Sequence, residues 1–346
     1  MPERERGIGH FRKTVLFGKK NNGNKVGVLP VEGEYKLEKR EGVGVMAIVL
    51  LKREAGVIYD FNQEHEPVLR VKSGTRVEIE AYDCFQNQVT SPETMLSEID
   101  WNKINPATGP ISIEGAQPGD VLKVTIEKLE VANRGVMATG PNLDVLGHRL
   151  NKLESKIVPV REGQIEFGHV KIPLRPMIGV IGVAPEGEGI PCGTPGRHGG
   201  NMDTTLVTEG ATLYFPVFVE GALFACGDFH AAMGDGEVGV SGVEVEGRVI
   251  VQLEVVKGEK LNHPLLENDE KYALIVSAPT LDEAAKTAAE EMVDRITEKS
   301  GMPASEVVML LSAAGHVEVS QIVDPLMTAR FSVPKAIIQQ MGIRLI

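Results

Sequence analysis

The chain has 346 residues, 42% of them hydrophobic and 24% charged, which is typical of a soluble globular protein with one large domain or two smaller ones. Its formal net charge is −12 and no basic stripe is interleaved with aromatic residues, so nucleic acid is excluded as an expected partner. No apolar run is long enough to predict a transmembrane helix, and the three cysteines stand at scattered positions. This argues against a disulfide scaffold and for a cytoplasmic protein.

The first 45 residues differ from the rest in charge and pattern. Residues 1–56 hold twelve Lys and Arg against seven Asp and Glu, whereas the remainder is acidic. Periodicity is weak here, and the apolar stretch of a signal peptide is missing. We therefore expect residues 1–45 to be an extension, poorly ordered or a non-native start, with a small ordered element as the alternative. Met46 opens the first segment with the pattern of folded sequence and is a candidate initiator.

From Val57 onward the pattern predicts mostly strands. Apolar and polar residues alternate in runs separated by turn residues, which favours a sandwich or barrel over βαβ units. The main runs are Pro67–Asp83, Gly119–Ala132, Gly168–Pro185, Ala211–Asp228 and Gly236–Gly258. We expect residues 46–260 to form one β-rich catalytic part.

The last third of the chain changes character. Apolar residues recur at helical spacing within Thr280–Gly301, where Thr280 and Glu283 form a capping box and Gly301 suits the C-terminal cap. A second helix is predicted over Pro303–Gly315, and a strand over His316–Val323. Residues 261–346 are thus expected to pack on the β-rich part. The predicted fold class is α+β and β-dominated. We expect a β-sandwich or barrel-like N-terminal part, followed by an α/β C-terminal part that contains two helices.

Two glycine-lined segments combine histidine with acidic residues. In PGRHGGNMD, residues 195–203, the side chains of His198, Asn201 and Asp203 can converge if the loop folds tightly. The plainer interpretation of the glycines is tight-turn chemistry, and that of a lone histidine is a hydrogen-bonded core residue. For two such segments we weigh a metal or catalytic site equally with these interpretations.

The second segment is GDFHAAMGDGE, residues 227–237. Asp228 and His230 would share one face of a strand, and Asp235 and Glu237 have the same spacing. Imidazole with carboxylates suits Zn²⁺, and carboxylates alone suit Ca²⁺ or Mg²⁺. The spacing matches neither the HExxH helix pair nor an EF-hand loop.

Two more segments join these candidates. Asp83 ends a predicted strand, and strand ends often hold functional side chains, although an ordinary polar turn is an equal alternative. Thr108 lies in NPATGPISIEGAQPGD, residues 105–120, which either forms a pocket wall or is a plain loop.

Several long segments, in chain order, carry a resemblance to a known family: YDCFQNQ, NPATGPISIEGAQPGD, MIGVIGVAP, PGRHGGNMD, PVFVEGALFACGDFHAAMGDGE and SAAGHVEVSQIVDP. Together they resemble the acetamidase/formamidase family from about Val57 to the C-terminus. The resemblance implies a β-rich part followed by an α/β part, and hydrolysis of short aliphatic amides to the acid and ammonia. Residues 1–45 have no counterpart in the family pattern. His316 stands where the family usually has an aspartate, which puts any role of that position in doubt.

The resemblance implies the active region, and chemistry suggests the roles within it. Amide hydrolysis needs an activated nucleophile, a stabilised oxyanion and a proton for the leaving nitrogen, and a metal ion can supply the first two. We expect a divalent metal, Zn²⁺ with Ca²⁺ as the alternative. The expected ligands are Asp83, His198, Asp203 and His230, with Asp228 and Asp235 as reserve ligands or groups that orient the histidines. The expected catalytic residues are Glu237 as general base and acid, His230 and Asn201, and the expected substrate-binding residues are Asn201, Gly200 and Thr108.

Two other functions stay open. A cysteine-dependent amidase would use Cys84 or Cys226, although a small buried apolar role is the plainer interpretation of both. A non-catalytic β module would hold Ca²⁺ or carbohydrate in the acidic loops, but aromatic residues make up only 5% of the chain. As partners we expect a small amide substrate, no nucleic acid and no membrane, with the chain forming a homodimer.

Overall fold

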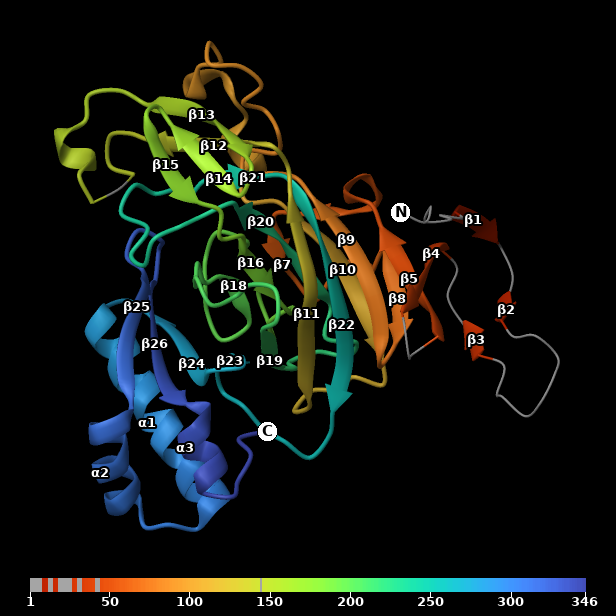
Figure 1. Cartoon of the computed structure of the whole chain (residues 1–346), viewed down its shortest axis with the longest axis vertical. Helices are drawn as coiled ribbons and strands as arrows, with labels where there is room; N and C mark the ends of the chain where they lie inside the picture. Colours follow the sequence, from red (N-terminus) through yellow and green to blue (C-terminus); the bar gives the residue numbers. More distant parts are fainter. Residues whose placement is uncertain (1–7, 12–14, 18–26, 30–32, 41–43, 144) are drawn as a thin grey trace.

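Strands dominate the regular structure, and the helices gather at one end beside the C-terminal strands (Figure 1). The computed structural model describes residues 8–11, 15–17, 27–29, 33–40, 44–143 and 145–346. Within them lie two large sheets and three α-helices. The predicted α+β, β-dominated class is confirmed.

The first large sheet has eleven strands and runs through most of the molecule. In spatial order they are β1 (Ile8–Phe11), β4 (Gly33–Arg40), β5 (Gly44–Leu51), β9 (Thr75–Ala81), β22 (Gly247–Val256), β11 (Val121–Val131), β19 (Thr212–Pro216), β23 (Leu265–Glu267), β24 (Lys271–Ala278), β26 (Met327–Pro334) and β25 (His316–Gln321). β5 and β9 pair in parallel, and the other neighbours are antiparallel. The sheet therefore continues from the β-rich part into the C-terminal part through the pairing of β19 with β23.

The second large sheet packs against the first through a shared core. Its path is β15 (Val170–Pro173), β14 (Gln164–Phe167), β13 (Glu154–Arg161), β12 (Arg134–Thr139), β21 (Glu244–Val245), β20 (Phe224–His230), β10 (Ala107–Glu114) and β6 (Val57–Ile58). Off this path, β16 (Met177–Gly182) pairs with β20 and with β18 (Gly199–Asn201), and β8 (Leu69–Lys72) pairs with β10. The remaining strands form two small pairs, β7 (Asp60–Phe61) with β17 (Ile190–Pro191) and β2 (Val15–Phe17) with β3 (Gly27–Leu29). Four 3₁₀ turns span Arg53–Ala55, Leu96–Glu98, Trp101–Lys103 and Gly147–Arg149.

The main core fills the space between the two sheets. Buried side chains from both contribute, among them Val77 and Val124 of the first sheet and Ile113 and Phe224 of the second. The run Pro67–Asp83 illustrates how one alternating segment serves both sheets. It divides at a turn in which Gly74 has a φ of 89°, so that β8 enters the second sheet and β9 the first. This arrangement is the predicted sandwich.

The helices cover one face of the C-terminal strands and enclose a second core (Figure 1). They are α1 (Leu281–Ser300), α2 (Ala304–Ala314) and α3 (Lys335–Gln340). Thr280 caps α1 by accepting the N–H of Glu283 at 3.2 Å, and Gly301 ends it with a φ of 69°. These caps confirm the predicted first helix, and α2 confirms the second. The short α3 was not predicted.

The run Gly236–Gly258 was expected to be strand throughout, but residues 236–243 form an irregular loop before β21 and β22. The expected extension, residues 1–45, lies partly outside the described residues. Where it is described, β4 pairs antiparallel with β5, and Lys36 reaches Glu78 of β9 at 3.1 Å. The boundaries at residues 45 and 260 stay predictions.

Among the described residues, the helices are all too short or too polar to span a lipid bilayer.

Candidate active site

Strand β16 brings the two glycine-lined segments together. It pairs with β18 on one side and β20 on the other, so that Val180 lies opposite both Asn201 and Gly227. Gly179 provides the space this requires, because a Cβ there would come within 2.5 Å of Asp203 Oδ1 and 2.6 Å of Asp228 Oδ2. The acidic side chains of both segments therefore meet beside a strand position where any added side chain would displace them.

The imidazole of His230 lies among buried carboxylates. Its Nε2 is 3.2 Å from Glu244 Oε2, 3.6 Å from Asp228 Oδ1 and 3.8 Å from Asp203 Oδ1. None of these four side chains is more than 3% exposed. Glu237 joins them, because ligand atoms of His230, Glu237 and Glu244 lie within 4.8 Å of one another. We call Asp203, Asp228, His230, Glu237 and Glu244 the His230 cluster.

Three members of the cluster have left-handed backbone conformations. The φ angles of Asp203, Asp228 and Glu237 are 38°, 54° and 45°. A residue with a side chain pays about 1–3 kcal/mol for such a conformation, which persists mainly at functional sites. The chain places a carboxylate at each of these positions, although glycine would adopt the backbone at lower cost. Positive φ also occurs outside the cluster, for example at Ala222 and Leu223, so its occurrence at three cluster residues supports a site there without proving one.

Several buried polar atoms of the cluster have no hydrogen-bond partner. They are Oδ1 and Oδ2 of Asp203, Oδ1 of Asp228, Nδ1 of His230 and Oε2 of Glu244, of which the Asp228 and Glu244 oxygens have only their ion pairs with His230. A buried carboxylate without a partner costs several kcal/mol, and a divalent cation satisfies carboxylates and imidazole together. Three overlapping groups of described residues bring three potential ligand atoms within 4.8 Å: Asp203–Asp228–His230, His230–Glu237–Glu244 and Cys84–Asp228–Glu244. The residues present therefore fit a divalent cation.

The pKa values of three of the four cluster carboxyls are raised, whereas His230 lowers the pKa of Asp228 in spite of its burial. Burial raises the pKa of Asp203 to about 6 and that of Glu244 to about 8. Burial, and then the charge of Asp203, raises the pKa of Glu237 well above its usual value. Burial by itself would lower the pKa of His230, but Glu244 and Asp228 outweigh it and raise that pKa well above the usual value. Without a cation, the cluster thus retains protons near neutral pH.

His198 is buried beside Phe61 rather than within the three groups. The two rings meet edge-on, with centroids 5.2 Å apart and planes at 67°. Neither ring nitrogen has a hydrogen-bond partner, and burial lowers the pKa of His198 to about 4. A Cβ at Gly200 would lie 3.0 Å from Nε2 of this histidine. The ring is therefore neutral at pH 7 and keeps a lone pair free for a ligand.

Asp83 and Thr108 hold backbone rather than join the three groups. Asp83 Oδ1 accepts the N–H groups of Phe85 at 3.0 Å and Asn87 at 2.6 Å, although burial still raises the pKa of Asp83 to about 6. Thr108 Oγ1 donates to the carbonyl of Glu80 at 2.7 Å. Both contacts fix the segments that border the cluster.

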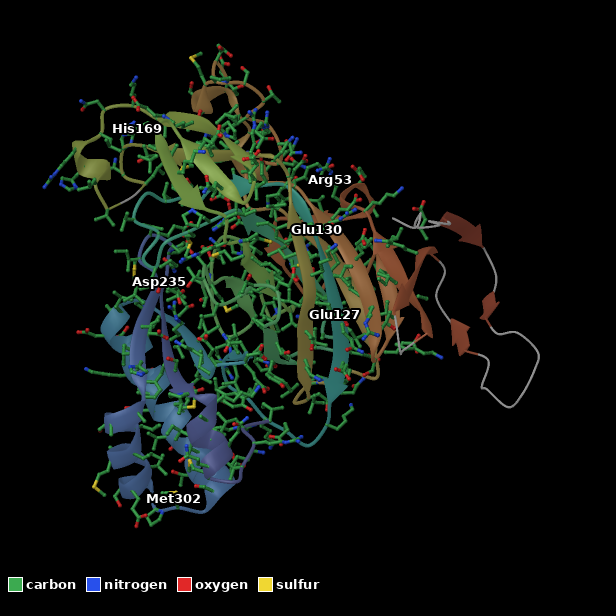
Figure 2. All side chains as sticks on the ribbon, viewed as in Figure 1. Arg53, Glu127, Glu130, His169, Asp235 and Met302 are labelled. Atoms are coloured by element: carbon green, nitrogen blue, oxygen red, sulfur yellow. The ribbon has the colours of Figure 1, made fainter. Side chains whose placement is uncertain are left out.

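Asp235 also stands outside the three groups. It lies where the ends of β25 and β26 approach the second sheet (Figure 2), and its Oδ2 forms an ion pair of 2.6 Å with Arg330. Its side chain is 45% exposed, unlike those of the cluster. The structure thus gives Asp235 a cationic partner other than a metal.

Two acids at the site were not among the predicted site residues. Glu244 is 2% exposed, yet the alternating run around it predicts an outward polar side chain. Asp324 accepts the Nδ2–H of Asn201 at 3.2 Å, and burial followed by the charge of Asp203 raises its pKa well above the usual value. Asp324 belongs to SAAGHVEVSQIVDP, so the resemblance gave a signal for it, whereas no local signal marks Glu244.

The cysteines Cys84, Cys192 and Cys226 are all free and buried. Burial raises the pKa of the Cys84 thiol well above its usual value, and the charges of Glu244 and Asp228 add to this. Burial also raises the pKa of Cys226. Because the thiolate is the nucleophile, both environments oppose nucleophilic chemistry at sulfur.

Comparison with known proteins supports the resemblance to the acetamidase/formamidase family that the sequence segments indicated. At the level of curated sequences, the chain is 22% identical to the acetamidase of Mycolicibacterium smegmatis over 260 residues, 54% of this chain and 63% of that protein. The chain thus spans about three-fifths of the length of the curated relatives it matches.

Solved structures give a fuller match. A recombinant predicted acetamidase/formamidase from Thermoanaerobacter tengcongensis is 52% identical with a TM-score of 0.84, covering 85% of this chain and 98% of that one. The acetamidase of Bacillus halodurans is 43% identical with a TM-score of 0.83, covering 85% and 100%. The model of the Acetamidase/Formamidase family matches residues 54–191 and 186–340. The chain belongs to the Acetamidase/Formamidase family.

Proposed function

We propose that this chain hydrolyses short aliphatic amides, such as acetamide and formamide, to the carboxylic acid and ammonia at the His230 cluster. The observation that carries the proposal is the buried imidazole of His230 surrounded by carboxylates with unsatisfied oxygens, within a family whose members include proteins named acetamidase and formamidase.

A divalent cation is part of the proposal. Asp203, Asp228, His230 and Glu244 would hold it, and neutral His198 is a further candidate ligand. Zn²⁺ is the first cation to test because imidazole and carboxylate both suit it, with Ca²⁺ second. When bound, such an ion polarises a carbonyl and lowers the pKa of water.

Glu237 is the proposed general base and acid. Burial, and then the charge of Asp203, raises its pKa well above the usual value, so its carboxyl binds a proton more readily than that of an exposed glutamate. It would take the proton of the attacking water at one carboxylate oxygen and deliver it to the leaving nitrogen. Proton delivery is needed because ammonia leaves readily only after the amide nitrogen is protonated.

Asn201 is the proposed amide-binding residue. Its Nδ2–H is donated to Asp324, whereas its Oδ1 is buried and has no partner. The free Oδ1 is an acceptor, so it suits an N–H of the substrate amide better than a developing oxyanion. The hydrogen bond to Asp324 thereby fixes the orientation of the Asn201 side-chain amide, so that Oδ1 rather than Nδ2 is available to the substrate. Gly200 has no side chain, so it would leave space for the substrate beside Asn201.

The first experiment measures ammonia release from acetamide and formamide by purified protein, before chelation, after chelation, and after Zn²⁺ or Ca²⁺ is returned. We expect activity to be lost on chelation and restored by one cation, with metal content followed by elemental analysis. Activity in protein shown to be metal-free would rule out the cation. Activity abolished by Cys84→Ser, with metal content unchanged, would favour the cysteine route.

We further propose that the protein acts as a homodimer in the cytoplasm. Exposed apolar side chains on α2 and on the edge strand β25, namely Val308, Met309 and Val317, support an interface there. Sedimentation analysis of the wild type and of Met309→Glu tests this: a monomeric wild type would rule the dimer out.

A further inference from the structure

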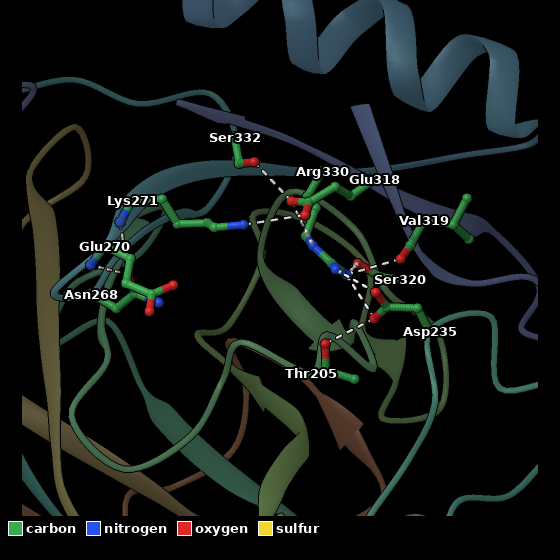
Figure 3. A network of polar contacts seen from close by, with 10 residues as sticks. All are labelled: Thr205, Asp235, Asn268, Glu270, Lys271, Glu318, Val319, Ser320, Arg330 and Ser332. Atoms are coloured by element: carbon green, nitrogen blue, oxygen red, sulfur yellow. Dashed lines mark hydrogen bonds and ion pairs between the residues drawn. The ribbon is translucent and has the colours of Figure 1, made fainter. Parts of the chain in front are cut away.

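Arg330 is a buried arginine whose three guanidinium nitrogens all donate hydrogen bonds. It lies on β26, its side chain is 3% exposed, and it occupies the centre of the polar network in Figure 3. Nη1 and Nη2 donate to the two carboxylate oxygens of Asp235 at 3.1 and 2.6 Å. Nη1 also donates to the Val319 carbonyl at 2.9 Å and to Ser320 Oγ at 3.1 Å, and Nε donates to Glu318 at 3.3 Å.

The bidentate pair with Asp235 holds the loop that carries Glu237. Asp235 precedes Glu237 by two residues, and Gly236 between them has a φ of 102°. The N–H of Gly236 donates to the carbonyl of Ser320 at 2.8 Å, and Ile322 donates to the carbonyl of Gly236 at 3.2 Å. The loop before Glu237 is thus fastened to the end of β25 both by backbone and by charge.

A second branch of the same network reaches the segment that carries Asp203. Thr204 Oγ1 donates to Ser320 Oγ at 2.9 Å, and Thr205 Oγ1 donates to Asp235 Oδ1 at 2.8 Å. Arg330 contacts both of the accepting groups. One guanidinium therefore links the loops of Asp203 and Glu237, two cluster residues with strained backbones.

We propose that Arg330 is a positioning residue for the His230 cluster. It holds Glu237 in place through Asp235, and Asp203 in place through Ser320 and Thr204. The proposal rests on the proposed function for its kinetic consequence, but not for its structural one. A planar, bidentate donor suits this task. Lysine can supply the charge but not two parallel hydrogen bonds to one carboxylate. Misplacement of a catalytic group by about 1 Å can cost about 10²-fold in rate.

Arg295 supplies a matched control. It is also buried, with a side chain 8% exposed, and it also donates to two carbonyls and a carboxylate, those of Leu345, Lys260 and Glu259. All of these partners lie outside the two site loops. Substitution of Arg295 should therefore cost stability as substitution of Arg330 does, without moving the cluster.

The test compares Arg330→Met, Arg330→Lys and Arg295→Met as full-length, cation-loaded proteins. We expect Arg330→Met to lower kcat by about tenfold or more with KM changed less, and Arg330→Lys to recover part of the loss. Deuterium exchange of residues 203–207 and 234–240 should accelerate in Arg330→Met only. Zn²⁺ affinity, measured by competition with a chelator, should fall in the same variant.

The outcomes separate the inference from the proposed function. If wild type releases no ammonia, the proposed function fails, and exchange together with Zn²⁺ affinity still decides the role of Arg330. If Arg330→Met matches Arg295→Met in kcat, or in exchange of the two loops, the inference is overturned. If Arg330→Met does not fold, Asp235→Asn weakens the same pair from its exposed side, and normal kcat and loop exchange in that variant would overturn the inference.

Discussion

The buried carboxyl of Glu244 makes the stability of the metal-free chain depend on pH in an unusual direction. Its pKa rises from 4.5 to about 8, mainly through burial. In a carboxyl whose folded pKa is raised, the contribution to stability is fully present below the unfolded pKa and is lost as pH rises through the folded pKa. We therefore expect the metal-free protein to lose stability between about pH 5 and pH 8.

The size of the effect follows from the same shift. Between the two pKa values the folded state holds one more proton than the unfolded state, and one pKa unit corresponds to about 1.4 kcal/mol. Ionising Glu244 thus costs the fold on the order of 4 kcal/mol by pH 8. Glu244→Gln removes this titration, so the variant should gain stability relative to wild type by that amount as pH rises.

The assay is urea unfolding of chelated wild type, Glu244→Gln and Glu246→Gln at several pH values from 5 to 8. Glu246 is the matched control two residues away. Burial by itself would raise the pKa of Glu246, but hydrogen bonds from Arg53 and Asn87 outweigh it and lower this pKa. Glu246 therefore does not titrate between pH 5 and pH 8. Saturating Zn²⁺ should reverse the slope of the wild type, because its ligands bind the cation only when deprotonated.

Parallel pH profiles for chelated wild type and Glu244→Gln would refute the reasoning. They would mean that Glu244 ionises without penalty, and hence that the cluster lacks the excess negative charge on which the cation proposal depends. A pH-dependent gain in the Glu246→Gln control would refute it as well.

Three further outcomes are expected. Glu237→Gln should lower kcat by about 10²–10⁴-fold without loss of bound cation, and unchanged ammonia release would remove Glu237 as general base. Gly179→Ala should abolish cation binding, because its Cβ would lie within 2.6 Å of two cluster carboxylates, whereas Gly239→Ala, with no heavy atom within 4 Å, should bind normally by elemental analysis. Cys226→Ala should cost on the order of 1 kcal/mol in thermal unfolding and leave kcat within about tenfold, and a complete loss of activity in folded protein would contradict the pKa argument.

The elements that the sequence predicts well are those with a local cause. Thr280 and Gly301 mark the ends of α1 because caps are chosen by backbone groups a few residues away. The strands of the sandwich follow from alternation, since each side chain either enters the core or meets solvent. The i, i+2 spacing of Asp228 and His230 predicted that they lie close together, and His230 Nε2 is 3.6 Å from Asp228 Oδ1, although the left-handed backbone of Asp228 has no signal in the sequence.

The rest of the site depends on pairing across the fold. Glu244 and Glu246 have the same alternation, but β21 buries the first, whereas the side chain of the second is 39% exposed. Asp235 has a carboxylate that could serve as a metal ligand. Only its contact with Arg330, 95 residues away, shows that it forms an ion pair instead. No local pattern reveals such distant partners.

The strand order of the eleven-stranded sheet has a consequence for synthesis. β22 lies between β9 and β11, although it follows β11 by about 115 residues. At roughly 5–20 residues per second, β9 and β11 wait on the order of ten seconds for the strand that joins them, with unpaired edges open to aggregation. Asp324 and Arg330 leave the ribosome later still. The contacts of Asp324 with Asn201 and of Arg330 with Asp235 therefore form last, after β22 has joined β9 to β11.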